Sequence, residues 1–183
     1  MNLKQIFFAL FFFISLLNPI SIRVINAESF ESHLNNGREK LSDNDFQGAL
    51  NEFNKVIEID PQNWRAYHNR GLSKLNLGEI EGALEDFTQA IELNQNPWAQ
   101  SFFERGNIYQ IQKKHKEAIA DFSKSLELEL FDAWAAFHNR GLSKLNLGEI
   151  EGALEDFTQA IKLNQNPWAQ SFFERGNIYQ IQK

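Results

Sequence analysis

The side chains that most often bind metal ions or move protons are present in this chain, which has four histidines and 24 acidic residues. The histidines are His33, His68, His115 and His138. None has a second histidine four positions away, the spacing that places two metal ligands on one helix face. The sequence therefore predicts no metal site and no cofactor.

Patterns for acid–base or nucleophilic catalysis are also missing from the sequence. The carboxylates Glu85, Asp86, Glu155 and Asp156 fall in helix-prone segments, where we expect them to face solvent as solvating charges. No serine or threonine has a histidine at a motif spacing, and no glycine-rich phosphate-binding loop occurs. We therefore expect neither an enzyme nor a small-molecule substrate.

The bulk composition narrows the classes of partner. The net charge is −6, and no basic stripe offsets it, so a nucleic-acid partner is not expected. The chain has no cysteine, which excludes disulfides, thiolate metal sites and a lipid-modified cysteine.

The elements that position these side chains form an internal repeat. Residues 68–113 return at 138–183 with one change, Glu92 to Lys162. A weaker repetition of 34 or 35 residues lies inside this period. It is marked by glycines, followed by alanines, aromatic residues and small or short residues: Gly37, Gly71, Gly106, Gly141 and Gly176; Ala49, Ala83, Ala118 and Ala153; Phe53, Phe87, Phe122 and Phe157; Val56, Ala90, Ser125 and Ala160.

Each unit predicts two helices of roughly 13 residues, because apolar residues recur at helical intervals. Gly78 and Gly148 suit the left-handed residue that closes a helix, and Asn44 and Lys113 occupy the same place in other units. Asn96-Pro97 and Asn166-Pro167 predict an N-cap followed by a first-turn proline. The internal glycines and alanines favour helix backbones in close contact, with the aromatic residues filling the core.

This pattern resembles the tetratricopeptide repeat in its bacterial form, with Asn-Arg-Gly at 69–71 and 139–141 and Ala-Ile-Glu-Leu at 90–93. The resemblance implies an all-α solenoid of antiparallel helix pairs, about four and a half repeats long. The predicted domain is 28–183, with repeats at about 30–63, 64–98, 99–133 and 134–168 and a half repeat at 169–183. The tryptophans Trp64, Trp98, Trp134 and Trp168 are expected to pack at repeat junctions.

In this family the first helix of each pair lines a concave groove that holds a peptide or a partner helix. The resemblance thus implies a scaffold for protein binding, with a mixed polar and apolar groove. The residues carried over to that groove are His68, Asn69, Leu72, Asn76, Phe103, Glu104, Asn107, Gln110, His138, Asn139, Leu142 and Asn146. The alternative is that these are merely exposed polar positions.

The family's clamp for a terminal carboxylate is not matched. The relevant positions hold Leu34, His68, Phe103 and His138 along one row. They hold Arg38, Leu72, Asn107 and Leu142 along the other. A chaperone-tail function in the cytosol is therefore disfavoured.

Residues 1–27 form a separate segment. Lys4 precedes the uncharged run Ile6 to Ile22, and the small residue Ala27 follows it, as in a secretory signal peptide. An uncleaved anchor is the alternative, with residues 6–22 as a membrane tether. Both place the repeats outside the cytosol, as an exported or membrane-anchored domain.

The final predicted helix has no second helix after it in the sequence. Its aromatic side chains would then be partly uncovered. We therefore expect self-association, as a homodimer, through Phe172, Ile178 and Tyr179. A membrane-anchored assembly component is the alternative to the peptide-binding scaffold.

Overall fold

The computed structural model describes residues 19–163 and 169–181, which are helical and contain no strand. The helices are α2 (Pro19–Ser42), α3 (Phe46–Ile59), α4 (Trp64–Asn76), α5 (Ile80–Leu93), α6 (Ala99–Ile111), α7 (His115–Glu127), α8 (Ala133–Asn146), α9 (Ile150–Leu163) and α10 (Ala169–Ile181). Within the described residues, no helix is long and apolar enough to span a bilayer.

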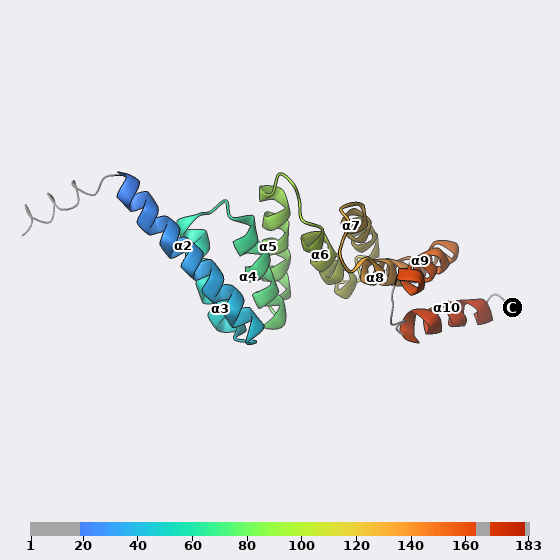
Figure 1. The fold of residues 1–183 in the computed structure, drawn as a ribbon. Helices are drawn as coiled ribbons and strands as arrows, with labels where there is room; N and C mark the ends of the chain where they lie inside the picture. Colours follow the sequence, from blue (N-terminus) through green and yellow to red (C-terminus); the bar gives the residue numbers. More distant parts are fainter. Residues whose placement is uncertain (1–18, 164–168, 182–183) are drawn as a thin grey trace, which may run out of the picture.

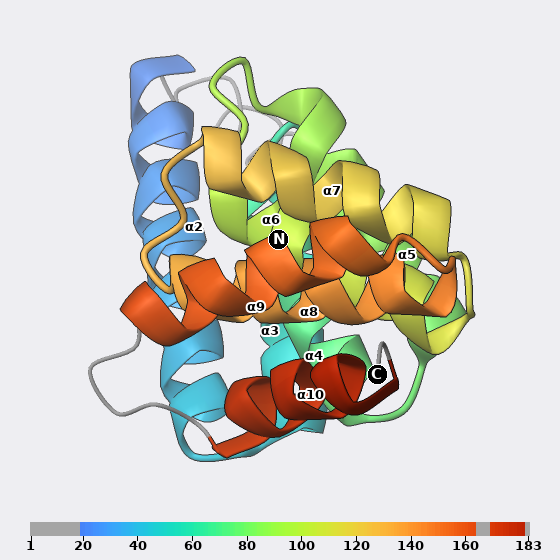
Figure 2. The same ribbon diagram turned by 90° about the vertical axis from the view of Figure 1, so that its right-hand side faces the viewer.

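The helices pair in chain order and stack in a row. α2 packs on α3, α4 on α5, α6 on α7 and α8 on α9, and each pair also contacts the next. Figure 1 shows the row running from α2 to α10, and Figure 2 views it from the end that α10 occupies. The predicted all-α solenoid is confirmed.

The core repeats one contact between a glycine and an aromatic ring. A Cβ atom at Gly71 would lie 3.0 Å from Cε1 of Phe87, and one at Gly106 would lie 2.8 Å from Cε1 of Phe122. The ring of each second helix therefore lies against the bare backbone of the first helix of its pair. Side chains larger than hydrogen would separate the two helices.

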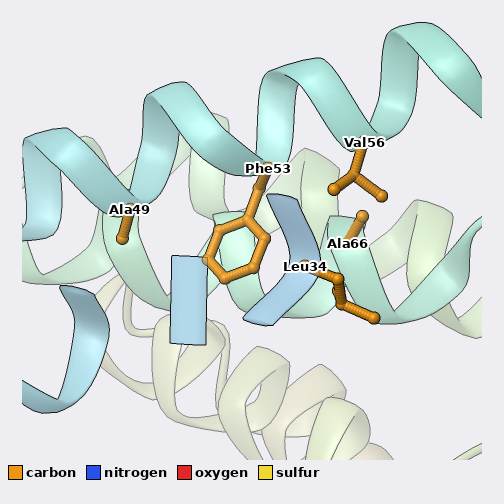
Figure 3. Close-up of a cluster of buried hydrophobic side chains, with 5 residues drawn as sticks. All are labelled: Leu34, Ala49, Phe53, Val56 and Ala66. Atoms are coloured by element: carbon orange, nitrogen blue, oxygen red, sulfur yellow. The ribbon is translucent and has the colours of Figure 1, made fainter. Parts of the chain in front are cut away.

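The first unit shows how the rest of each core is filled. Figure 3 shows Phe53 between Ala49 and Val56 on α3, with Leu34 from α2 and Ala66 from α4 beside them. All five side chains are at most 5% exposed. Because Ala66 belongs to the next pair, the cluster also joins one repeat to its neighbour.

A buried ion pair accompanies the ring in three units. Arg70, Arg105 and Arg140 bind the carboxylates of Asp86, Asp121 and Asp156 through paired hydrogen bonds of 2.6–2.9 Å. Two of these carboxylates, those of Asp86 and Asp156, were expected from the sequence to face solvent. The assignment of Asp86 and Asp156 was wrong, because both are 2% exposed. Each also bonds a lysine, Lys74 or Lys144, at 2.9 Å.

The helix ends follow the predicted turn residues in part. Gly78 and Gly148 have positive φ angles of 81° and 79°, and Asn44 and Lys113 also adopt positive φ. The N-cap prediction at Asn96-Pro97 was wrong, because α6 begins after Trp98. Asn94 Oδ1 accepts a hydrogen bond from the Asn96 backbone, which holds this segment in a turn. The corresponding pair at 166–167 lies outside the described residues.

The structure describes only part of the predicted N-terminal segment, from residue 19 onward. α2 begins at Pro19 and continues past Ala27, the predicted boundary. Most of the run from Ile6 to Ile22 lies outside the described residues, and cleavage or anchoring stays a prediction.

Candidate functional site

His68 does not line an open surface as the sequence predicted. Its side chain is 1% exposed and its Nδ1 lies 2.9 Å from the Ser101 hydroxyl of α6. The rings of Phe87 and Trp98 enclose it, with centroid distances of 5.4 and 4.6 Å. Burial lowers the pKa of His68 to about 4. His68 therefore joins two repeats as a neutral side chain and does not line a groove.

His138, the equivalent residue of the fourth unit, is half-buried. Its Nδ1 lies 2.7 Å from the Ser171 hydroxyl of α10. Burial lowers its pKa, and the charge of Glu174 opposes that shift. Among residues 19–163 and 169–181, no group of three or more histidine and acidic side chains is placed to hold a metal ion.

Several predicted groove amides lie together between α6 and α8 and bind one another. Gln110 donates to the Asn139 carbonyl at 2.9 Å and to the Ser143 hydroxyl at 3.1 Å. Asn139 donates to Asn107 at 2.8 Å, and Asn107 donates to Glu104 at 3.3 Å. Burial raises the pKa of Glu104, and its hydrogen bonds oppose that shift. These groups form a polar strip that fixes the two first helices against each other.

The remaining predicted groove residues fall into two groups. Leu72, Leu142 and Phe103 are partly buried against the repeat cores. Asn76 and Asn146 are exposed and donate to the backbone carbonyls of Leu72 and Leu142 on their own helices. These five residues do not come together at a single site.

The structure does form a pocket where α2, α4 and the start of α6 meet. It has a volume of about 330 Å³ and is lined by Arg38, Trp64, Arg65, Asn69 and Trp98. The indole rings of Trp64 and Trp98 meet edge to face at 5.8 Å, and the Arg65 guanidinium lies 4.7 Å from the Trp64 ring centre. Of these residues, only Asn69 was on the predicted list.

The two tryptophans are spaced one repeat apart, which is the signal that could have located this pocket. They were expected to pack at the junction, and Trp98 is nevertheless 47% exposed. The fourth unit carries Trp134 and Ala135 where the second has Trp64 and Arg65, so it lacks the second arginine. The Arg–Trp pocket, defined by its five lining residues, therefore belongs to the second unit.

The predicted self-association residues are placed on different sides of α10. Phe172 is 42% and Tyr179 is 53% exposed, whereas Ile178 is 2% exposed. Ile178 packs with Ala153 and Phe157 of α9 and is not available at the surface. Self-association itself stays a prediction.

Models of the repeat family match most of the helical region. The match covers residues 37–78, 64–97, 99–129 and 135–167, each as a tetratricopeptide repeat, or TPR. The chain contains tetratricopeptide repeats. The helix pairs, the Gly–Phe contacts and the 34- or 35-residue step are thus features of TPR units.

A curated relative is similar to this chain in sequence, and several solved structures are similar to it in fold. The TPR repeat-containing protein MJ1428 of Methanocaldococcus jannaschii is 28% identical over 147 residues, which is 80% of this chain. The alignment spans only 19% of that relative, so the chain corresponds to about a fifth of its length.

Among solved structures, MamA has a TM-score of 0.75 at 21% identity, covering 84% of this chain and 82% of that one. YrrB, a TPR protein with an unusual peptide-binding site, has a TM-score of 0.72 at 22% identity, covering 82% and 76%. The first TPR of Spaghetti, bound to the HSP90 peptide SRMEEVD, has a TM-score of 0.62 at 21% identity, covering 66% and 94%.

Proposed function

We propose that this TPR protein is a non-catalytic scaffold that holds an acidic peptide segment at its Arg–Trp pocket. TPR proteins with this fold bind protein or peptide partners: YrrB has a peptide-binding site, and the first TPR of Spaghetti is bound to a peptide. The peptide held by Spaghetti carries Glu-Glu-Val-Asp at its end. The single observation that carries the proposal here is the pocket lined by two arginines and two tryptophans.

The side chains that line this pocket indicate which kind of peptide it would bind. Two arginines, Arg38 and Arg65, line a cavity in a chain whose net charge is −6. Guanidinium groups bind carboxylates with charge-assisted hydrogen bonds, and indole faces bind apolar or planar groups. An extended peptide that alternates acidic and apolar side chains suits both the arginines and the tryptophans, and Asn69 lines the same pocket with an amide that can bind a peptide backbone.

A pair of synthetic peptides tests the proposal. The probe is a labelled peptide of alternating glutamate and phenylalanine, and its control has glutamine at every glutamate. We expect the acidic probe to bind the full chain more tightly and to weaken with added salt. The double variant Arg38→Gln/Arg65→Gln should lose about tenfold or more in affinity.

The matched control variant is Lys116→Gln, which removes one exposed positive charge on α7, outside the pocket. It should bind the acidic probe like the unmodified chain. Equal binding of the glutamate and glutamine peptides, or unchanged binding by the double arginine variant, would overturn the proposal.

We place this scaffold outside the cytosol, on the strength of the N-terminal segment alone. Lys4, the uncharged run to Ile22 and Ala27 are the features that support export. Mass measurement of the mature N-terminus decides between the two alternatives. A start at Glu28 indicates a cleaved signal peptide, and a retained Met1 indicates an anchor.

The second candidate function is a membrane-anchored assembly component. It is supported by the same apolar run and by the exposed aromatic side chains of α10, Phe172 and Tyr179. Extraction that requires detergent, together with a retained N-terminus, favours this candidate over a freely soluble adaptor.

A further inference from the structure

Glu104 of α6 is a partly buried carboxylate that two uncharged amides bind. Gln100 Nε2 donates to its Oε1 at 2.7 Å, and Asn107 Nδ2 donates to its Oε2 at 3.3 Å. Asn107 in turn accepts a hydrogen bond from Asn139 of α8, so the chain of amides is oriented toward the carboxylate. Glu104 accepts at both oxygens, which is the role of an ionised carboxylate.

The buried aspartates of the same repeats differ from Glu104 in having a positive partner. Asp86, Asp121 and Asp156 are each bound by an arginine at 2.6 or 2.7 Å. Within the part of the chain that the structure describes, no lysine, arginine or histidine forms an ion pair with Glu104. Burial raises the pKa of Glu104, and the two amide hydrogen bonds oppose that shift. A carboxylate held in this way costs free energy and keeps lone pairs free for a further donor.

Neighbouring repeats show that the polar strip does not need a negative charge at this position. The equivalent residues are asparagines, Asn69 on α4 and Asn139 on α8, and the position is glutamate again at Glu174 of α10. Asn139 takes part in the strip through neutral hydrogen bonds with Asn107 and Gln110. An uncharged amide therefore suits this position, and fixing the first helices against each other does not explain the carboxylate.

The same repeat position connects Glu104 with the Arg–Trp pocket. Asn69, one repeat earlier, lines that pocket, and so does Trp98, which directly precedes α6. The hydrogen bond between His68 and Ser101 shows that α4 and α6 are in contact. Equivalent residues on helices packed in this way lie about 8–10 Å apart. An extended peptide spans that distance with about three residues.

We propose that Glu104 binds a lysine or arginine side chain of the same peptide whose acidic side chains occupy the Arg–Trp pocket. This inference rests on the proposed function and adds a second charge to the ligand, about three residues from the first. The cation donates to the free lone pairs of the Glu104 carboxylate in a charge-assisted hydrogen bond. An acidic side chain at the same place is repelled, so the two sites together set the direction in which the peptide lies.

Six peptides with blocked ends test the proposal. In three of them, the last glutamate of the acidic probe is followed by two serines and a test residue, which is lysine, glutamine or glutamate. The other three carry the serines and the test residue before the first glutamate, because the ligand can run in either direction. At one of the two ends, we expect the lysine peptide to bind the full chain about three- to tenfold more tightly than the glutamine peptide. The glutamate peptide should bind more weakly than both.

The variant Glu104→Gln assigns the lysine preference in a double-mutant cycle. It should bind the lysine and glutamine peptides equally, since the carboxylate that distinguishes them is gone. It should melt at the same or a higher temperature than the unmodified chain, because it removes a partly buried charge without a positive partner. A carboxylate with a purely structural role would lower the melting temperature when replaced and would leave the lysine preference intact.

The matched control is Glu174→Gln, which removes the same charge from the same helix sequence in α10, two first helices farther along the row. Its preference for the lysine peptide should equal that of the unmodified chain, because the test residue does not reach α10. Loss of the preference in this variant would contradict the assignment to Glu104.

The outcomes separate this inference from the proposed function. A chain that binds the acidic probe through Arg38 and Arg65 but shows no lysine preference at either end contradicts this inference alone. A lysine preference that survives in Glu104→Gln does the same. A chain that binds neither the acidic probe nor its lysine forms contradicts both proposals.

Discussion

The two copies of the duplicated segment, residues 68–113 and 138–183, differ at one position and yet have different surroundings. In the first copy, α6 lies between α5 and α7. In the second copy, α10 packs on α9 and meets α8 through Ser171, and no described helix takes the place of α7. Phe102 is 8% exposed and its counterpart Phe172 is 42% exposed. The same residues are therefore core in one place and surface in the other, because the neighbouring helix decides their role.

The largest effect that sharpens this comparison comes from removing the paired aromatic side chains. Phe102→Ala should lower the free energy of unfolding by about 3–4 kcal/mol, since it leaves a cavity in place of a buried ring. Phe172→Ala should cost about 1 kcal/mol or less, because that ring is already partly hydrated. Urea unfolding of the two variants, measured side by side, checks the difference, and equal losses would break the comparison.

The paired arginines should differ nearly as much. Arg105→Ala leaves the buried carboxylate of Asp121 without its partner and should cost about 3 kcal/mol. Arg175→Ala removes only a contact with the Phe172 ring and should cost about 0.5 kcal/mol. Thermal unfolding of both variants tests this, and Lys116→Gln serves as the surface-charge control.

The paired histidines predict a loss of stability in acid. His68 has a pKa of about 4 in the folded chain against 6.5 when exposed, so the unfolded chain binds more protons between these values. The contribution of His68 is complete above 6.5 and is lost as the pH falls toward 4, by roughly 2 kcal/mol between neutral pH and pH 5.

The variants His68→Gln and His138→Gln assign that loss. Urea midpoints measured across this pH range should become flatter for His68→Gln. The change should be smaller for His138→Gln, because His138 is half-buried and Glu174 opposes the lowering of its pKa. A steeper acid loss in His68→Gln would contradict the assignment.

The smallest effect is expected at the paired glycines. Gly106→Ala should destabilise the chain by about 1 kcal/mol, because the added methyl group pushes Phe122 away and this outweighs the gain in helix propensity. Gly176→Ala should stabilise α10 by about 0.5 kcal/mol, since only the helix propensity changes there. The two variants should shift the melting temperature in opposite directions: Gly106→Ala should lower it and Gly176→Ala should raise it. Shifts in the same direction would contradict this prediction.

The sequence was sufficient for features that depend on one repeat. The internal glycines predicted helix backbones in close contact with aromatic rings in the core, and Gly106 lies against Phe122. The predicted turn residues Gly78 and Asn44 adopt the left-handed backbone. The burial of Asp86 was missed, although an arginine stands 16 residues before it and the same spacing recurs at Arg105–Asp121. Asp86 was expected to be exposed because it is a charged residue in a helical segment.

Features that join two repeats were harder to predict. His68 lies on a first helix, but whether it faces the groove or the next first helix depends on the angle between repeats. The same angle brings Trp98 onto Trp64 and leaves the pocket between them. No local spacing contains that information, so the groove list was only partly useful.

Amide hydrogen exchange, followed residue by residue by NMR, tests most directly whether neighbouring helices stabilise each unit. α6 and α10 have the same sequence, so most of their amides have the same intrinsic exchange rates and differ only in protection. We predict that the central amides of α6 are at least roughly a hundredfold more protected than those of α10. Equal protection in the two helices would contradict the account, because each helix would then be stable without its neighbour.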